Sequence, residues 1–366
     1  MNAQRQPVSS AGIDQHAKLE DDFELLDIML VDAEHQPPLY NPGDYWAAKA
    51  RNAAKEIKKY GIADFRGSTN LIGMSYADNL CIDSRNSYNQ GLKKWARWLT
   101  NFFPVNRIFD SQVRLTEVRA NEAIAYAQEV IRLKEKDRRL LEKYSVPYSL
   151  LGQCLTKAEI DGKEYSTHYL SLLEQHDNIA SHINFKKAHS IFEIGGGFGT
   201  NVHLLLENYK NIKKVLYLDI QPNLYVGTQY LKAFYGDSVI DYRASRDLKS
   251  IKFSDDETLE IYCITPWQIE NFAGTIDIFM NSHSFVEMPK EVARNYAAKF
   301  SGFRESADAA IALTTYGWFN LDSTYLPSEL PTFFGGRKFE YFEAGTLLDS
   351  SERNIFFVSS GKLANK

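Results

Sequence analysis

Cysteine is scarce in this sequence of 366 residues, which contains only three. Cys81, Cys154 and Cys263 are far apart and form no C-x-x-C pair. Neither a disulfide framework nor a cysteine zinc site is therefore indicated. A reducing, cytoplasmic environment fits this cysteine usage best.

An excess of positive charge is also lacking, because Asp and Glu number 47 against 42 Lys and Arg, and the formal net charge is −5. The chain as a whole has no general attraction to nucleic acid or to an anionic membrane. No stretch reaches the roughly 20 apolar residues of a membrane-spanning helix, and residues 1–15 lack the apolar region of a secretory signal. We expect a soluble protein with no nucleic-acid partner.

The first 150 residues have a mostly helical pattern. Residues 44–60 are rich in Ala and Lys, with Asp44 as the expected N-cap and Gly61 as the stop signal. Further helices are predicted at 87–103, where apolar residues recur at helical spacing, and at 110–144.

The pattern changes near residue 150, where Pro147 and Gly152 interrupt the helical run. Asp161-Gly162 predicts a turn, and another helical stretch follows. With 44% hydrophobic residues, the chain can bury the cores of two or three domains. We expect a flexible tail (1–20), a helical N-terminal domain (21–150), a connecting segment (151–187) and a second domain (188–366).

The second domain alternates short apolar runs with helical stretches, which indicates βαβ units and a parallel sheet. Two later runs, 339–343 and 355–359, predict a closing antiparallel hairpin. The fold class is therefore α/β, with the Rossmann-like sheet order of class I methyltransferases, although dinucleotide-binding dehydrogenases begin similarly. The parallel strands are expected at 190–194, 214–218, 259–264, 276–280 and 309–315.

A glycine loop follows the first of these strands. Gly195, Gly196, Gly197 and Gly199 stand in five positions, two residues after Glu193. Glycine permits the backbone angles of such a turn and lets a ligand lie against the main chain. A dinucleotide fingerprint, G-x-G-x-x-G, would need glycine where Thr200 stands. The observed spacing, acidic-x-G-x-G-x-G, resembles the first motif of class I methyltransferases.

That resemblance implies S-adenosylmethionine as the cofactor, with the four glycines around its amino acid part and Glu193 ordering the loop and meeting its ammonium group. Asp219, at the tip of the second strand and followed by Ile220, is placed to bind two ribose hydroxyls. After the third strand, Trp267 would flank the adenine, and Gln268 or nearby backbone would read its edge. Packing in the core is an equal alternative for Trp267.

The loop after the fourth strand carries the candidate catalytic residues. Asn281, His283 and Glu287 lie between the strand and a helix that begins after Pro289, at the carboxyl edge where open α/β sheets bind ligands. Histidine is the natural base for removing a hydroxyl proton. We predict His283 as the base and Glu287 as its orienting partner. Asn281 is expected to bind the acceptor or to hold the loop.

The loop segments 192–199 and 277–288 together resemble sugar O-methyltransferases of bacterial surface-polysaccharide clusters, and residues 160–163 are also similar to that family. The resemblance covers about half of the chain, roughly 152–316. It implies a sugar or nucleotide-sugar hydroxyl as the acceptor. In a related architecture the helical N-terminal region would form a lid or a homo-oligomer surface. Aromatic residues at 316–320 and 333–337 could stack on a sugar ring or pack on a small core.

Several alternatives stay open at this stage. Asp277, Asp241 or Glu287 could bind a metal ion, yet the sequence contains no tight carboxylate cluster, so no metal is expected. N-directed transfer would favour an Asn/Asp-Pro-Pro-aromatic sequence after the fourth strand, and none is present. A nicotinamide-dependent sugar oxidoreductase is disfavoured by Thr200. A regulatory protein would bind the cofactor without turnover.

Overall fold

A computed structural model of the chain describes residues 17–66, 138–148, 150–154, 157–316, 325–345 and 353–365. The predicted helix at 87–103, most of the one at 110–144, Cys81 and the first 16 residues of the predicted tail lie outside the described residues. Within the described residues, no helix is both long and apolar enough to cross a membrane.

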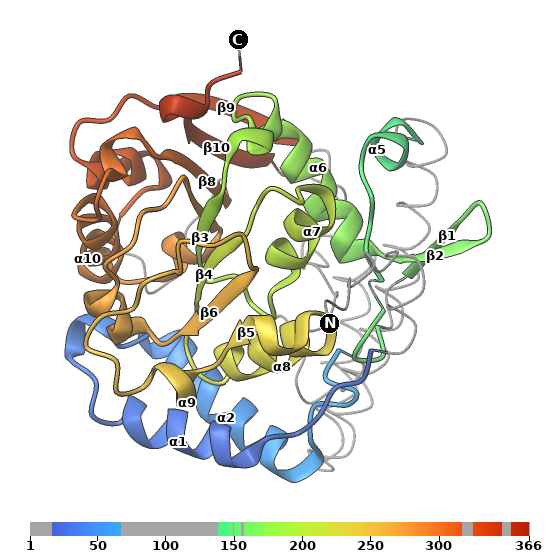
Figure 1. Ribbon diagram of the computed structural model, residues 1–366, viewed down its shortest axis with the longest axis vertical. Helices are drawn as coiled ribbons and strands as arrows, with labels where there is room; N and C mark the ends of the chain where they lie inside the picture. The colour runs from blue at the N-terminus through green and yellow to red at the C-terminus, as the bar shows by residue number, and fades with distance from the viewer. Residues whose placement is uncertain are drawn as a thin grey trace, which may run out of the picture.

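The main sheet has eight strands in the order β5-β6-β4-β3-β7-β8-β10-β9 (Figure 1). All neighbours are parallel except the two pairs that β10 makes with β8 and β9. The predicted α/β fold, a mainly parallel sheet that ends in an antiparallel hairpin, is confirmed. The strands are β3 (Ser190–Ile194), β4 (Lys214–Leu218), β5 (Val239–Ile240), β6 (Glu260–Ile264), β7 (Ile278–Ser282), β8 (Ala310–Tyr316), β9 (Glu340–Gly345) and β10 (Arg353–Ser359).

Side chains alternate between the two faces of the sheet, because successive strand residues point in opposite directions. Ile191 and Val215 belong to one buried apolar cluster, and Phe192 and Leu216 belong to the other. Both faces are therefore covered, which explains why the strands read as continuous apolar runs. Residues of α7 (Thr200–Asn208) and α8 (Asn223–Tyr235) join the first cluster, and residues of α10 (Lys290–Ser301) join the second.

The order of the strands reverses at β3, since β4 lies on one side of it and β7 on the other. A crevice forms at such a switch point, outside the carboxyl ends of the strands. The loops after β3, β4 and β7 all leave from this edge, which we call the carboxyl edge. The fold therefore brings the glycine loop, Asp219 and the loop after β7 to one place.

Strand β5 and the one-turn helix α9 (Tyr242–Ser245) were not predicted. Two strand residues are too few to show the period-two alternation by which a strand is recognised. Asp241 caps α9 through a hydrogen bond from the Ala244 N–H and pairs with Lys232 of α8. The sheet thus has one more edge strand than expected.

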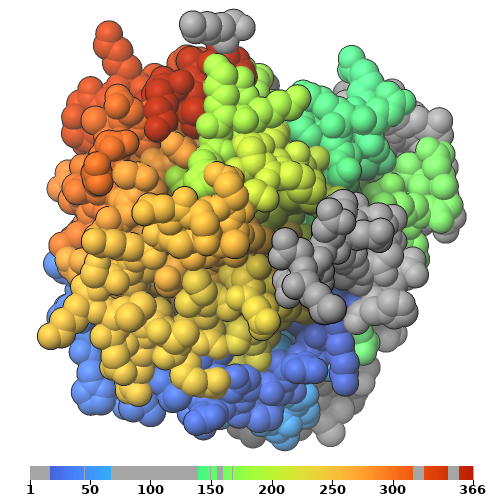
Figure 2. All heavy atoms as spheres, viewed as in Figure 1, coloured from blue at the N-terminus to red at the C-terminus, as the bar shows by residue number. Residues whose placement is uncertain are grey.

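The first helices cover the carboxyl edge; we call α1 (Phe23–Ala33), η2 (Pro38–Tyr40) and α2 (Asp44–Tyr60) the N-terminal cap. In Figures 1 and 2 the blue cap residues lie beside the yellow segment that includes α8 and α9. Leu26 and Ile57 of the cap belong to the same apolar cluster as strand residues. The described part of the predicted N-terminal domain therefore shares its core with the sheet.

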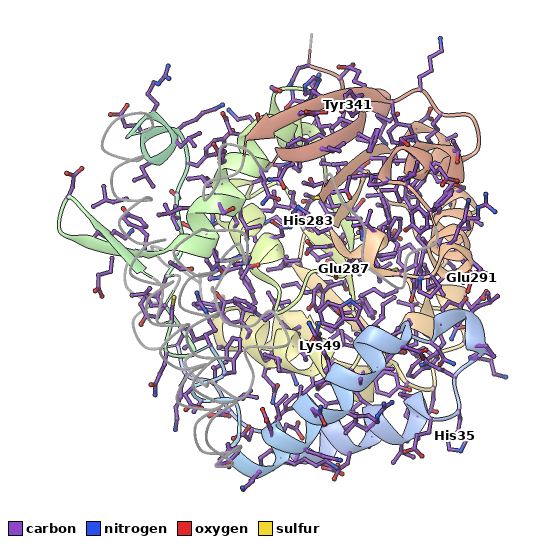
Figure 3. All side chains as sticks on the ribbon, turned by 180° about the vertical axis from the view of Figure 1, so that it is seen from behind. His35, Lys49, His283, Glu287, Glu291 and Tyr341 are labelled. Atoms are coloured by element: carbon purple, nitrogen blue, oxygen red, sulfur yellow. The ribbon has the colours of Figure 1, made fainter. Side chains whose placement is uncertain are left out.

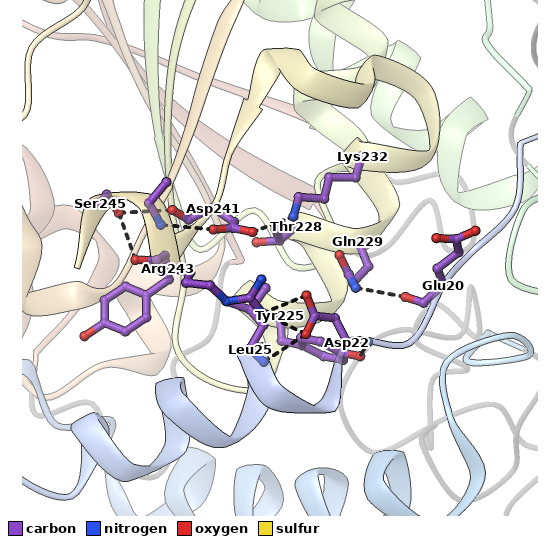
Figure 4. Close-up of polar contacts among 12 residues, drawn as sticks. Glu20, Asp22, Leu25, Tyr225, Thr228, Gln229, Lys232, Asp241, Arg243 and Ser245 are labelled. Carbon is purple, nitrogen blue, oxygen red and sulfur yellow. Dashed lines mark hydrogen bonds and ion pairs between the residues drawn. The ribbon is translucent and has the colours of Figure 1, made fainter.

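Polar contacts fasten α1 to the sheet domain (Figure 4). Asp22 accepts two hydrogen bonds from the guanidinium of Arg243 and one from the backbone N–H of Leu25, so it also caps α1. In the last turn of α1, Asp32 accepts two hydrogen bonds from Nε and Nη2 of Arg246. Arg243 lies in α9 and Arg246 is its C-cap residue, so the unpredicted β5–α9 unit is one of the places where the cap attaches.

Two boundaries differ from the sequence prediction. Asp44 is not the N-cap of α2, because Gly43 is the cap residue and Asp44 is the first helical residue. A carboxylate there still complements the positive end of the helix dipole. Leu19 is buried and the Glu20 carbonyl accepts a hydrogen bond from Gln229, so these two residues of the expected tail pack against the rest of the protein.

The connecting segment holds a hairpin and a helix. Asp161 and Gly162 have positive φ angles of 51° and 78° and form the predicted turn between β1 (Lys157–Ile160) and β2 (Lys163–Ser166). Ser166 then caps α6 (Thr167–Ala180). The remaining helices are α5 (Arg138–Lys143) and the short 3₁₀ turns η4 (Phe185–Lys187), η5 (Gly236–Ser238), η6 (Pro266–Asn271), η7 (Ser284–Glu287), η8 (Ser306–Asp308), η9 (Pro327–Phe334) and η10 (Gly361–Leu363).

We predict that the double variant Asp22→Asn/Asp32→Asn loosens the cap without unfolding the sheet. Asparagine still caps a helix, so the change removes mainly the two ion pairs, each worth at most about 1 kcal/mol at partly exposed positions. Hydrogen exchange of the α1 amides should accelerate severalfold. Asp27→Asn, also on α1, removes an exposed ion pair with Lys58 of α2 inside the cap; it is the control and should change little. Unchanged exchange in the double variant would refute the attachment.

Candidate active site

The glycine loop adopts backbone angles that favour glycine, since φ is +73° at Gly195, +64° at Gly197 and +87° at Gly199. The loop is also crowded. A Cβ at Gly195 would overlap the side chain of Ser284, which belongs to the loop after β7. The two loops therefore touch directly, which places the residues after β7 next to the glycine loop.

Glu193 lies beneath this loop with its carboxylate buried. Its Oε1 accepts a hydrogen bond of 2.8 Å from Nδ2 of Asn201, whereas Oε2 is buried without a hydrogen-bond partner. Burial raises the pKa of this carboxyl to about 7. A buried carboxylate oxygen that lacks a donor is costly, and a bound cation or donor would relieve that cost.

Asp219 leaves the end of β4 and faces the same loop. Its Oδ2 accepts a hydrogen bond of 2.8 Å from the Gly197 N–H, and its Oδ1 accepts one of 2.7 Å from the Ile220 N–H. Burial and then the charge of Glu193 raise its pKa to about 7, against the two backbone hydrogen bonds that lower it. The predicted residues Glu193, Asp219 and Ile220 therefore meet at the glycine loop. Glu193 and Asp219 form an acidic pair there, and the charge of Glu193 acts on Asp219.

Trp267 and Gln268 begin η6, directly after β6. Trp267 packs edge-on against Tyr242 of α9, with ring centroids 6.1 Å apart. The Gln268 side chain is buried and hydrogen-bonds Thr265 and Ser245, so it ties η6 to α9. Contact with adenine stays a prediction for both residues, and the Gln268 side-chain amide is already engaged within the protein.

Asn281 ends up holding the loop after β7, one of the two roles expected for it. Its buried Nδ2 donates to the Ile194 carbonyl at 2.9 Å and to Ser284 Oγ at 2.6 Å, while Oδ1 accepts from the Phe285 N–H. These contacts bind the loop to the end of β3. Asn281 therefore shapes the site, and its amide is already engaged.

His283 and Glu287 do not form the predicted pair. His283 Nε2 lies 2.9 Å from Oδ1 of Asn354 on β10, and Glu287 Oε2 accepts a hydrogen bond of 3.1 Å from the Trp46 indole of the cap. Figure 3 shows Glu287 between His283 and Lys49 of α2, and the charge of Lys49 acts on Glu287. The pairing was wrong because β10 and α2, distant in sequence, supply the actual partners.

Burial moves the two pKa values in opposite directions, since it disfavours the charged form of each group. The pKa of Glu287 rises to about 7, and that of His283 falls to about 4. At neutral pH the imidazole is therefore uncharged.

His168, at the start of α6, is a neighbour that sequence reasoning missed. Its Nε2 lies 3.1 Å from Oγ1 of Thr200, and its ring centroid lies 5.9 Å from that of Phe198 in the glycine loop. Its charge contributes to lowering the pKa of His283. No sequence signal connects a helix N-terminus in the connecting segment with this loop.

The aromatic segment 333–337 does not lie at the carboxyl edge. Phe334 is buried in the second apolar cluster, and Arg337 hydrogen-bonds the carbonyls of Ser306 and Ala309, which precede β8. This segment packs on the core beside the amino end of that strand. Residues 317–320 lie outside the described residues.

The three carboxylates considered as metal ligands do not share a site. Asp277 binds the backbone of His189 and Ser190 at the amino end of β3, and Asp241 caps α9. Glu287 faces the cap instead. Across the described parts of the chain, no three His, Cys, Asp or Glu side chains are grouped as metal ligands would be.

No protein-family model and no curated protein matches the sequence. Among solved structures, the chain is similar to MtNAS in complex with MTA and tNA, with 15% identity, 87% of this chain and 98% of that chain covered, and a TM-score of 0.35. It is also similar to the N-methyltransferase NodS from Bradyrhizobium japonicum WM9 in complex with S-adenosyl-L-homocysteine (10%, 51% and 86%, TM-score 0.33).

A further similar structure is the cyclopropane synthase MmaA2 from Mycobacterium tuberculosis (9% identity, 65% of this chain and 98% of that chain, TM-score 0.37). All three TM-scores are below 0.5, so these likenesses do not bear on what this chain does. Its function has to be inferred from the geometry of its own site.

We predict that Gly196→Ala disrupts the site, because the new Cβ would lie 2.5 Å from Oε2 of Glu193 and 2.9 Å from the Tyr217 ring. Overpacking of this kind costs about 1–3 kcal/mol, measurable by urea unfolding. Gly302→Ala is the control, since its Cβ would meet carbonyl oxygens only at 3.4 Å and beyond. Equal stability of the two variants would contradict the crowding.

The raised pKa of Glu193 also predicts how stability changes with pH. A carboxyl with a pKa raised on folding stabilises the protein at low pH, and this contribution is lost as pH rises through about 7. Between about pH 5 and pH 7.5, the melting temperature of the ligand-free protein should therefore fall more steeply for wild type than for Glu193→Gln. Glu291→Gln, at an exposed site, should follow wild type. Parallel curves for all three would rule out the burial effect.

Proposed function

We propose that this protein is an S-adenosylmethionine-dependent methyltransferase. The observation that carries the proposal is the pair of buried carboxylates, Glu193 and Asp219, beneath a glycine loop at the switch point of the sheet. Burial raises the pKa of both acids, and the charge of Glu193 raises that of Asp219 further, so the site favours a ligand that brings positive charge. S-adenosylmethionine carries both a sulfonium and an ammonium group.

The residues present fit this cofactor. Oε2 of Glu193 lacks a donor, which an ammonium group would supply. Each Asp219 oxygen accepts one backbone N–H, and the Asn223 side chain also hydrogen-bonds this carboxylate, whose acceptor capacity would extend to a ribose hydroxyl. Gly196 is a position where any side chain would displace the Glu193 carboxylate. When bound, the cofactor would supply a methyl group already activated for transfer.

The same acids argue against a nicotinamide dinucleotide. A pyrophosphate bound at the start of α7 would place negative charge next to Glu193 and Asp219. Thr200 also replaces the last glycine of the dinucleotide fingerprint. An oxidoreductase therefore remains the weaker candidate.

For the acceptor we propose a hydroxyl of a sugar or nucleotide sugar, in keeping with the resemblance of residues 277–288 to sugar O-methyltransferases. The contact between Ser284 and Gly195 sets that loop beside the proposed methyl donor. His283 is uncharged at neutral pH and would accept the hydroxyl proton. Trp46 and Glu287 would line the same side, with the N-terminal cap as the lid.

Calorimetric titration with S-adenosylmethionine and, separately, with NAD tests the proposal. The methyl donor should bind saturably, and Asp219→Ala should weaken it at least tenfold, which corresponds to about 1.4 kcal/mol. Asp255→Ala, at an exposed position between β5 and β6, should bind like wild type. Binding of NAD alone, or an Asp219→Ala variant with wild-type affinity for the methyl donor, would reject the assignment.

A further inference from the structure

Glu193 of β3 and Asp219, which follows β4, meet the glycine loop at consecutive residues. Oε2 of Glu193 faces Gly196 directly, since a Cβ at that glycine would lie 2.5 Å from this oxygen. Oδ2 of Asp219 accepts its hydrogen bond of 2.8 Å from the N–H of Gly197, the next residue. Two carboxyl groups are therefore set against one turn of the chain, and the charge of Glu193 acts on Asp219.

The two carboxyl groups are not equally supplied with hydrogen-bond donors. Both oxygens of Asp219 accept backbone N–H groups, and the Asn223 side chain also bonds this carboxylate. Oε1 of Glu193 accepts from Asn201, but its buried Oε2 has no partner within the described residues. Burying an ionised oxygen without a donor costs far more than burying a neutral carboxyl group. The geometry therefore favours a proton on Glu193 in the ligand-free protein.

The side chains that face the pair from neighbouring elements are uncharged. They are Asn201 of α7, Asn223 of α8, Tyr217 of β4, Tyr296 of α10 and, through Asn201, Ser282 of β7. Only the two tyrosines of this set can titrate. A phenol is either neutral or negative, so neither tyrosine can balance an ionised carboxylate.

The glycine loop also has basic neighbours. The guanidinium carbon of Arg66 lies 5.2 Å from the centre of the Phe198 ring, and Nε2 of His168 lies 3.1 Å from Oγ1 of Thr200. Burial raises the pKa of Glu193 to about 7 against the hydrogen bond from Asn201, and neither base contributes to this shift. Positive charge would therefore reach this carboxylate with a ligand.

We propose that the Glu193–Asp219 pair retains at least one proton in the ligand-free protein at neutral pH, and that binding of the methyl donor expels this proton into solvent. The inference rests on the proposed methyltransferase function and adds a control by pH to it. A ligand with a sulfonium, an ammonium and a carboxylate group brings one net positive charge, and the departing proton carries one away. Affinity for the methyl donor then falls as the pH is lowered, because protons compete with it for the same carboxylates.

Calorimetric titration with S-adenosylmethionine in buffers of different ionisation enthalpy tests this exchange. At pH 6.5 the observed binding enthalpy should vary linearly with the ionisation enthalpy of the buffer, with a slope that corresponds to release of about one proton per ligand. Between pH 5.5 and pH 6.5 the dissociation constant should fall about tenfold for each proton released. The α-amino group of the ligand, with an ordinary pKa of about 7.7–8.0, stays protonated over this range.

Variants locate the proton. Glu193→Gln should release fewer protons than wild type, and its affinity should depend less on pH. Glu287→Gln is the matched control, because it removes another carboxyl whose pKa burial raises to about 7, one that contacts the cap. This control should release as many protons as wild type. Methylthioadenosine, which carries neither the sulfonium nor the amino acid part, should expel distinctly fewer protons than the methyl donor.

A wild-type binding enthalpy that is independent of the buffer, or an affinity that is constant between pH 5.5 and pH 6.5, would overturn the inference. So would undiminished release in Glu193→Gln, release lost in Glu287→Gln, or equal release by methylthioadenosine. If Glu193→Gln fails to fold, the wild-type slope decides alone. Failure of the methyltransferase assignment looks different, since wild type would then not bind S-adenosylmethionine in any of the buffers.

Discussion

Close approach between the glycine loop and its neighbours is the constraint on which the site depends. Glu193 fills the space where Gly196 lacks a side chain, and Ser284 fills the space at Gly195. Tyr217 reaches the Gly197 carbonyl from β4 at 2.5 Å. Three strands therefore meet at one turn, and a side chain at Gly195 or Gly196 would push them apart.

This packing explains the electrostatics of the site. Because the loop covers Glu193 and Asp219, water cannot stabilise their charges, and the pKa values of both rise to about 7. The arrangement reduces the stability of the ligand-free protein, as is common where a structure is preorganised for a ligand. It becomes favourable once positive charge is bound, which is the physical basis of the proposed preference for S-adenosylmethionine.

The acceptor side is assembled from more distant parts of the chain. The loop after β7 contributes His283 and Glu287, the C-terminal hairpin contributes Asn354, and the cap contributes Trp46. His283 and Glu287, the two candidate proton acceptors, are thus each hydrogen-bonded to a side chain from a different element of the fold. The cap is attached to Arg243 and Arg246 at α9, and the same short helix contacts Trp267 and Gln268, the residues proposed to lie near adenine.

The sequence by itself determined the parallel sheet, the glycine loop and the acids at its base, because these depend on local spacing. Strands β3 and β4 lie where their apolar runs predicted. Glu193 and Asp219 were identified from their positions relative to the glycine loop and to the end of the second strand. It did not reveal β5, which is too short to show a period. Only the tertiary structure decided the partners of His283 and Glu287, because Asn354 and Trp46 are 71 and 241 residues away from them. Such pairings arise from strand order and from how the cap packs, and no local pattern encodes them.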